Sequence, residues 1–212
     1  MSGDSVNRAG VKYLTIPATG STVIVLQIGT DLIVAGAVAN PAASQVIYDS
    51  GYVGTDQSSI DTGVNGIPLG FAELEISLHG QGTAAAAQVS NEMQLNGDTG
   101  SNYVFQEIYI KGTTPNYGRS TRSFLQFGDI PAASAGEGTD EWSDTKIWMP
   151  FYDSPNRKQI ISLSRGYDNT TPYPYSQFEV SEWLNGSAIN RITWKCSSGN
   201  LKAGSRMRII GR

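Results

Sequence analysis

Apolar residues in this chain recur at every second position, in short runs that end at Gly, Pro, Asn or Asp. The clearest run is Phe71–His79, in which Ala, Leu and Ile alternate with Glu and Ser. A period of two is typical of a strand with one face on a core and the other face in water. The chain is therefore predicted to fold almost entirely into strands.

Further runs of this kind follow, with turn-forming residues between them. They are Glu92–Leu95, Tyr103–Lys111, Arg122–Phe127, Lys146–Tyr152, Gln159–Arg165, Gln177–Trp183, Ala188–Cys196 and Ser205–Ile210. Many short strands separated by turns predict an all-β fold, either an antiparallel sandwich or a barrel.

A change in this pattern divides the chain into three predicted parts. The stretch Val23–Ala39 predicts two apolar strands joined by a turn at Gly29-Thr30-Asp31. We predict an N-terminal β segment at residues 1–45, a linking stretch at 46–67 and a main sandwich at 68–212. Because two strands alone are marginal in water, the first segment is expected to dock on its own sandwich, on sister subunits or on another protein.

Composition argues against several classes of function. The formal net charge is −4 and the basic residues form no stripe, so a nucleic-acid partner is not expected. No uninterrupted apolar stretch reaches the roughly 20 residues of a membrane span, so membrane insertion is not expected. The first residues lack a basic and then apolar leader, which predicts synthesis in a cytoplasm.

Catalytic and metal-binding signals are sparse. His79 is the single histidine, which excludes any site that needs two, and we expect it on the polar face of its strand. Cys196 is the single cysteine and ends an apolar run, which favours a buried side chain over a reactive or interchain thiol. The chain is therefore predicted to be no enzyme and to use no cofactor and no metal.

Two features keep an alternative open. Four carboxylates gather at Glu137, Asp140, Glu141 and Asp144, and a pair of carboxylates is what glycoside hydrolysis requires. Their Gly/Ser/Thr-rich surroundings favour solvated acids over a depolymerase. The turn Asn96–Asn102 has oxygen ligands at alternate positions, which favours a turn network over a calcium loop because the EF-hand glycine and glutamate are missing.

Four segments resemble parts of tailed-bacteriophage virion structural proteins. In chain order they are Leu95–Tyr103, Ile160–Tyr167, Ala188–Ile192 and Ser198–Arg206. The resemblance covers residues 70–212 and implies a jelly-roll-like β-sandwich of the fibre, spike or capsid-decoration type. It also implies a homotrimer on the exterior of the particle.

Glycines in the last of these segments make a structural prediction of their own. Gly199 and Gly204 permit two bends, which would let Ile189–Cys196 and Arg206–Ile210 pair as neighbouring strands.

The best candidate for recognition is an aromatic loop that contains Tyr167, Tyr173 and Tyr175. Tyrosines beside Asn, Asp and Thr suit contact with a sugar or a protein receptor, although packing under the loop itself is the favoured alternative. The tryptophans are also expected to suit subunit contacts, since aromatic residues are enriched there. They are Trp142, Trp148, Trp183 and Trp194.

The leading functional hypothesis is a non-enzymatic structural protein of a tailed-phage virion. We expect a surface-exposed fibre- or spike-like appendage subunit that contacts other virion proteins through residues 1–45. The alternatives are a capsid-decorating protein and a carbohydrate- or receptor-binding module for host attachment.

Overall fold

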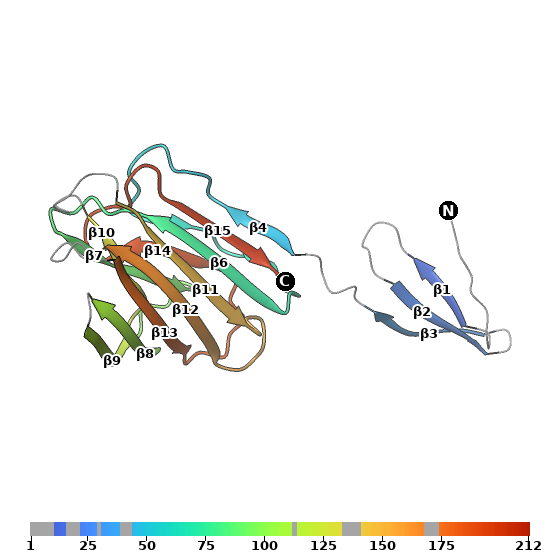
Figure 1. Cartoon of the computed structure of the whole chain (residues 1–212). Coiled ribbons are helices and arrows are strands. Elements are labelled where there is room, and N and C mark those ends of the chain that lie inside the picture. The colour runs from blue at the N-terminus through green and yellow to red at the C-terminus, as the bar shows by residue number, and fades with distance from the viewer. Residues whose placement is uncertain are drawn as a thin grey trace. The chain divides into compact units, whose positions relative to one another are not determined.

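A computed structural model gives the fold of the chain (Figure 1). The residues that it describes are 11–15, 22–28, 31–38, 44–111, 114–132, 141–167 and 174–212. The chain divides into two compact units, Met1–Ala43 and Ser44–Arg212. Each unit is built from strands, and the described residues include no helix long and apolar enough to cross a membrane.

The first unit is a small antiparallel sheet. Its strands are β1 (Val11–Thr15), β2 (Thr22–Ile28) and β3 (Asp31–Val38), in the order β1-β2-β3. The two strands predicted in this apolar stretch are β2 and β3, which pair with Ile28 opposite Asp31. The structure adds β1 as a third strand on the other side of β2.

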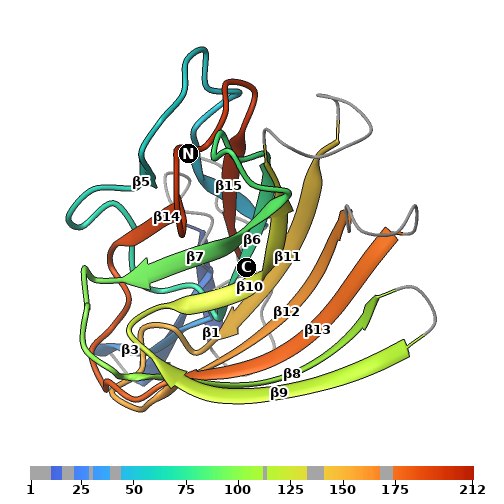
Figure 2. The same cartoon turned by 90° about the vertical axis from the view of Figure 1, so that its left-hand side faces the viewer.

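The second unit is an antiparallel sandwich of two unequal sheets (Figure 2). One sheet is eight-stranded, with the order β4-β15-β6-β11-β12-β13-β8-β9, and the other is four-stranded, with the order β10-β7-β14-β5. The strands are β4 (Gln45–Asp49), β5 (Ile60–Asp61), β6 (Glu73–Gly80), β7 (Gln88–Leu95), β8 (Tyr103–Lys111), β9 (Thr114–Arg122), β10 (Leu125–Pro131), β11 (Ser143–Pro150), β12 (Lys158–Tyr167), β13 (Pro174–Trp183), β14 (Ile192–Cys196) and β15 (Arg206–Gly211). The predicted all-β sandwich is confirmed.

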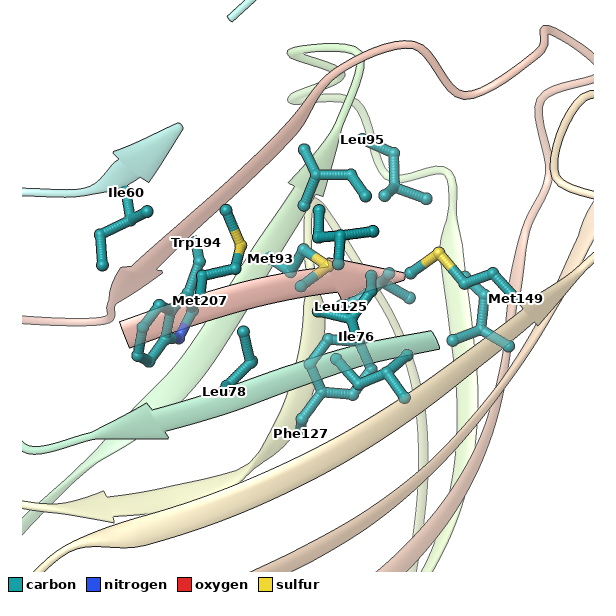
Figure 3. Close-up of a cluster of buried hydrophobic side chains, with 14 of the residues drawn as sticks. Ile60, Ile76, Leu78, Met93, Leu95, Leu125, Phe127, Met149, Trp194 and Met207 are labelled. Atoms are coloured by element: carbon teal, nitrogen blue, oxygen red, sulfur yellow. The ribbon is translucent and has the colours of Figure 1, made fainter. Parts of the chain in front are cut away.

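The core lies between the two sheets (Figure 3). Leu74, Ile76 and Leu78 of β6 are at most 2% exposed, as the alternation in this run predicts. They meet residues of the smaller sheet such as Met93 and Trp194, which are fully buried. Full burial of an aliphatic or aromatic side chain contributes about 1.5–3 kcal/mol, so this layer holds the two sheets together.

The predicted pairing of the last two strands is wrong. Gly199 and Gly204 do adopt left-handed backbone, with φ of 68° and 97°. However, β14 pairs with β5 and β7, whereas β15 pairs with β4 and β6 in the opposite sheet. The connection between β14 and β15 therefore crosses the sandwich, and its fully buried Leu201 packs in the core. Burial of Trp194 and Met207 from opposite sheets explains why the strands separate.

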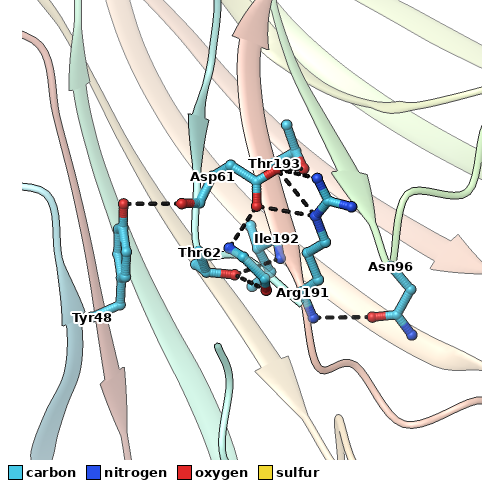
Figure 4. Close-up of polar contacts among 8 residues, drawn as sticks. Tyr48, Asp61, Thr62, Asn96, Arg191, Ile192 and Thr193 are labelled. Carbon is cyan, nitrogen blue, oxygen red and sulfur yellow. Dashed lines mark hydrogen bonds and ion pairs between the residues drawn. The ribbon is translucent and has the colours of Figure 1, made fainter. Parts of the chain in front are cut away.

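The stretch predicted as a linker, residues 46–67, belongs to the sandwich. Its strands β4 and β5 pair with β15 and β14. Asp61 of β5 forms an ion pair with Arg191 at 2.6 Å, and Thr193 donates a hydrogen bond to the same carboxylate at 3.0 Å (Figure 4). The Arg191 hydrogen bonds lower the pKa of Asp61. The segment looks loop-like in sequence because its strands are short and their partners lie more than 100 residues away.

Candidate functional site

The eight-stranded sheet has an ordinary amphipathic half, made of β4, β15, β6 and β11. Its inner face is apolar: Ile209, Ile76 and Ile147 stand opposite one another on β15, β6 and β11, and all are fully buried. On the outer face the next row along is Arg208, Ser77 and Lys146. We call these strands the charged half, after their outer face.

The same rows reverse their polarity in the other half of the sheet, β12, β13, β8 and β9. The inner row that starts with the three isoleucines continues with Ser162, Glu179, Glu107 and Gly118. The outer row that starts with Arg208, Ser77 and Lys146 continues with Leu163, Phe178, Ile108 and Tyr117. Along these two rows the half carries polar residues inside and apolar residues outside, and we call it the reversed half. Its other inner positions include the buried apolar side chains Phe105, Ile160 and Trp183.

The outer surface of the reversed half forms one continuous apolar face, because its residues are cross-strand or diagonal neighbours. Its members, with their exposed fractions, are Ile108 (46%), Ile110 (45%), Tyr117 (75%), Ile161 (38%), Leu163 (52%), Phe178 (46%) and Val180 (44%). A hollow of about 450 Å³ opens beside Val104, Gln106 and Val180. Large contiguous apolar patches on soluble domains mark interaction sites.

A buried polar network lies on the inner side of the reversed half. The Gln177 side-chain amide donates to Glu107 Oε2 at 2.6 Å and to Glu179 Oε2 at 3.1 Å. The Ser181 hydroxyl donates to the other oxygen of Glu179. Burial raises the pKa of Glu179 to about 8, and the nearby Glu107 carboxylate adds to this rise. Because Glu179 is only 1% exposed, its neutral form fits this site best at neutral pH.

Two glycines make room for this network. A Cβ on Gly118 of β9 would come 2.3 Å from Glu107 Oε1. On β10, Gly128 has a φ of 73°, and a Cβ there would come 3.0 Å from Gln177 Oε1. The polar side chains therefore fill the space between β10 and the reversed half of the larger sheet.

The tyrosines predicted for receptor contact have different outcomes. Tyr167 ends β12 and its side chain lies outside the described residues, as does all of Tyr173. Tyr175 is 4% exposed, and its hydroxyl donates to Gln177 inside the sandwich. A ring so deeply buried is not available to a host receptor. Tyr175 instead packs inside the sandwich, as the alternative interpretation of the aromatic loop predicts.

Two of the tryptophans expected at subunit contacts are core residues. Trp183 and Trp194 are fully buried, and their indole N–H groups donate to Asp98 and Asn91. Cys196 is also buried, at 6% exposed, and burial raises the pKa of its thiol to about 12.

The predicted acidic cluster is only partly described. Glu137 and Asp140 lie outside the described residues, and Glu141 is half-buried. Asp144 is exposed on β11, and its Oδ1 lies 2.8 Å from Nδ1 of His79. Within the described part of the chain, no group of three or more His, Cys, Asp or Glu residues is arranged to hold a metal ion.

The turn after β7 forms the hydrogen-bond network that its sequence favours. One oxygen of Asp98 accepts hydrogen bonds from the Gly100 amide at 2.8 Å and from the Asn102 side chain at 3.2 Å. The other oxygen accepts from Asn102 and from the buried Trp183 indole at 2.8 Å. Both carboxylate oxygens thus serve N–H donors within the fold.

Comparison with known proteins gives no relative: no protein-family model matches the chain, and no curated protein matches it either.

Proposed function

We propose that this protein is a non-enzymatic structural subunit that assembles with further copies of itself through the apolar face of the reversed half. The observation that carries this proposal is an exposed apolar row in a sheet whose other half has a charged outer face. The row consists of Leu163, Phe178, Ile108 and Tyr117. Covering such a face removes apolar surface from water, which is the main driving force of association.

A second copy is the occupant that this face fits best. The surface holds both a projecting ring, Tyr117, which is 75% exposed, and the hollow beside Val104 and Val180. A copy of the same surface therefore offers both a projecting ring and a hollow to receive one.

The particle in which these copies assemble is proposed from the sequence. The resemblance over residues 70–212 supports a tailed-phage virion, with the sandwich displayed as a homotrimer on the particle exterior. The separate unit Met1–Ala43 supports a fibre- or spike-like appendage anchored by its N-terminal segment, over a capsid decoration.

Sedimentation of the purified chain tests the assembly. The wild-type protein is expected to sediment as an oligomer, and Phe178→Lys is expected to sediment as a monomer, because a buried unpaired charge opposes association. The matched control is Val64→Lys, which places the same charge on a loop residue that is 73% exposed. A monomeric wild type at high concentration, or an oligomer unaffected by Phe178→Lys, would contradict the proposed interface.

Cryo-electron microscopy of intact particles tests the virion assignment separately. Density for the sandwich on a tail appendage is the expected result. Copies on the capsid surface would instead support the decorating role, and particles that lack the protein would overturn the assignment.

A further inference from the structure

A pocket of about 270 Å³ lies on the charged half of the large sheet, away from the apolar face. It opens beside the loop that follows β4 and extends over the outer side of β15, β6 and β11. The side chains that matter most in its lining are Tyr52, Ser77, His79, Lys146, Arg206 and Arg208. The volume suits a single sugar ring or a small anion better than a drug-sized ligand.

Aromatic rings build one side of this pocket. Tyr52 is 66% exposed, and the Arg206 guanidinium lies 5.1 Å from the centre of its ring. The His79 ring stacks on Trp142 at 4.8 Å with an interplanar angle of 10°. Gly204 permits this stack, because a Cβ there would come 2.7 Å from the Trp142 ring.

Backbone hydrogen bonds hold the Tyr52 loop in place. Val53 donates to the Ser205 carbonyl at 2.9 Å, and Gly204 donates to the Val53 carbonyl at 2.8 Å. The exposed tyrosine thus stands on a fixed backbone beside β15, which lowers the entropy cost of binding a ligand against it.

The cations of the pocket differ in how fully they are paired. Arg206 donates to both oxygens of Asp49, with Nε at 2.9 Å from Oδ1, and this lowers the pKa of Asp49 to about 2. Lys146 donates to Glu75 at 2.9 Å and to Ser77 at 2.6 Å.

Arg208 is the exception among these cations. Its Nε lies 4.0 Å from Asp49, and this buried atom has no hydrogen-bond partner among the described residues. The Arg208 side chain as a whole is 43% exposed, so the outer nitrogens of its guanidinium can donate to an anionic ligand in the pocket.

We infer that this pocket binds a saccharide that carries a carboxylate, such as a uronic acid. The carboxylate would accept hydrogen bonds from Arg208, whose planar fork matches it. The sugar ring would lie against Tyr52, because an aromatic face covers the C–H groups of a pyranose. Its hydroxyls would meet Ser77 and the His79–Asp144 pair.

This inference does not rest on the proposed assembly, since the pocket and the apolar face lie on different halves of the sheet. Measuring ligand binding and sedimentation on the same samples therefore separates the failure of one from the failure of the other.

Titration calorimetry with digalacturonic acid as the probe tests the inference, with a neutral galactose disaccharide and inorganic phosphate alongside. The expected result is that digalacturonic acid binds and that the neutral disaccharide and phosphate do not. Equal binding of the neutral sugar would remove the carboxylate from the proposal. Binding of phosphate but of neither sugar would reduce the site to a simple anion site, and no binding of any probe would overturn it.

Variants then assign the contacts. Arg208→Gln and Tyr52→Ala are each expected to weaken uronic acid binding at least about tenfold, the loss of one charge-assisted contact or one stacking surface. The matched controls, Arg119→Gln and Phe151→Ala, remove a similar exposed group away from the pocket and should leave binding unchanged. Because Tyr52 is a loop residue, its variant keeps the test decisive if Arg208→Gln fails to fold. Unchanged binding by Tyr52→Ala would contradict the proposed site.

Discussion

The charged half and the reversed half belong to one hydrogen-bonded sheet, but along two of its cross-strand rows their inner and outer residues have opposite polarity. Between β11 and β12, the inner row changes from Ile147 to Ser162 and the outer row changes from Lys146 to Leu163. β10, an edge strand of the four-stranded sheet, packs against β12, β13 and β8 of the reversed half, beside the polar network. One continuous sheet can therefore serve as a core wall at one end and as an interaction surface at the other.

The largest expected effect comes from truncating the same residue type in each half. Ile76→Ala removes a fully buried side chain from the charged half and should lower the free energy of unfolding by about 2–5 kcal/mol. Ile161→Ala, at 38% exposed on the apolar face, should cost the isolated subunit less than about 1 kcal/mol. Urea denaturation below the association concentration measures both. Equal losses would erase the distinction between the two halves.

A loss of stability with rising pH is expected from Glu179 in the reversed half. The native pKa of Glu179 is about 8, above its unfolded value of 4.5, so the native state holds a proton that the unfolded state has released between these values. Stability should therefore fall as pH rises from 4.5 to about 8, by up to about 1.4 kcal/mol per pH unit. Two charged groups face Glu179 from nearby strands: the Glu107 carboxylate of β8 raises the pKa of Glu179 further, and the Arg122 guanidinium of β9 opposes that rise.

Glu179→Gln isolates that contribution, because glutamine keeps the shape of the side chain and cannot ionise. Denaturation midpoints measured between pH 5 and pH 8 should lose most of their slope in this variant. Glu73→Gln is the control, since this half-exposed glutamate of β6 lies in the charged half. A slope that survives Glu179→Gln unchanged would show that Glu179 is already ionised in the folded protein.

The smallest expected effect concerns Ser162, which stands opposite Glu179 on the inner face. Its hydroxyl is buried and has no hydrogen-bond partner among the described residues. Ser162→Ala should therefore leave stability unchanged or raise it slightly, within about 1 kcal/mol. Ser181→Ala removes a donor to Glu179 and should be destabilising by thermal denaturation. If Ser162→Ala lowered the melting temperature more than Ser181→Ala did, Ser162 would belong to the hydrogen-bond network of Glu179.

Period-two alternation was enough to predict the strands and the sandwich, but it could not predict which face of each strand points inward. In Ile161–Ser164, apolar and polar residues alternate as in β6, yet Leu163 points outward and Ser164 inward. Only the register with β11 and β13 decides the orientation, and register depends on residues far apart in sequence. The apolar face was therefore not visible from any one strand.

The pocket on the charged half was missed for a similar reason. His79 and Asp144 lie 65 residues apart in the chain, so no local pattern in the sequence brings them together. Tyr52 fell in the stretch that was predicted as a linker. The hydrogen-bond network of the turn after β7 was predicted correctly because Asp98 accepts from Gly100 and Asn102, which are local in sequence. Its bonds to distant residues, such as that from Trp183 to Asp98, could not be predicted.

Thiol labelling of the assembled protein tests the central claim most directly. Cys196 is buried with a pKa raised to about 12, so it contributes little background. We would compare Ile108→Cys, in the middle of the apolar face, with Lys146→Cys, on the same outer row in the charged half. The account predicts that assembly protects position 108 from maleimide and leaves position 146 reactive. Equal labelling of both positions in the assembled protein would contradict it.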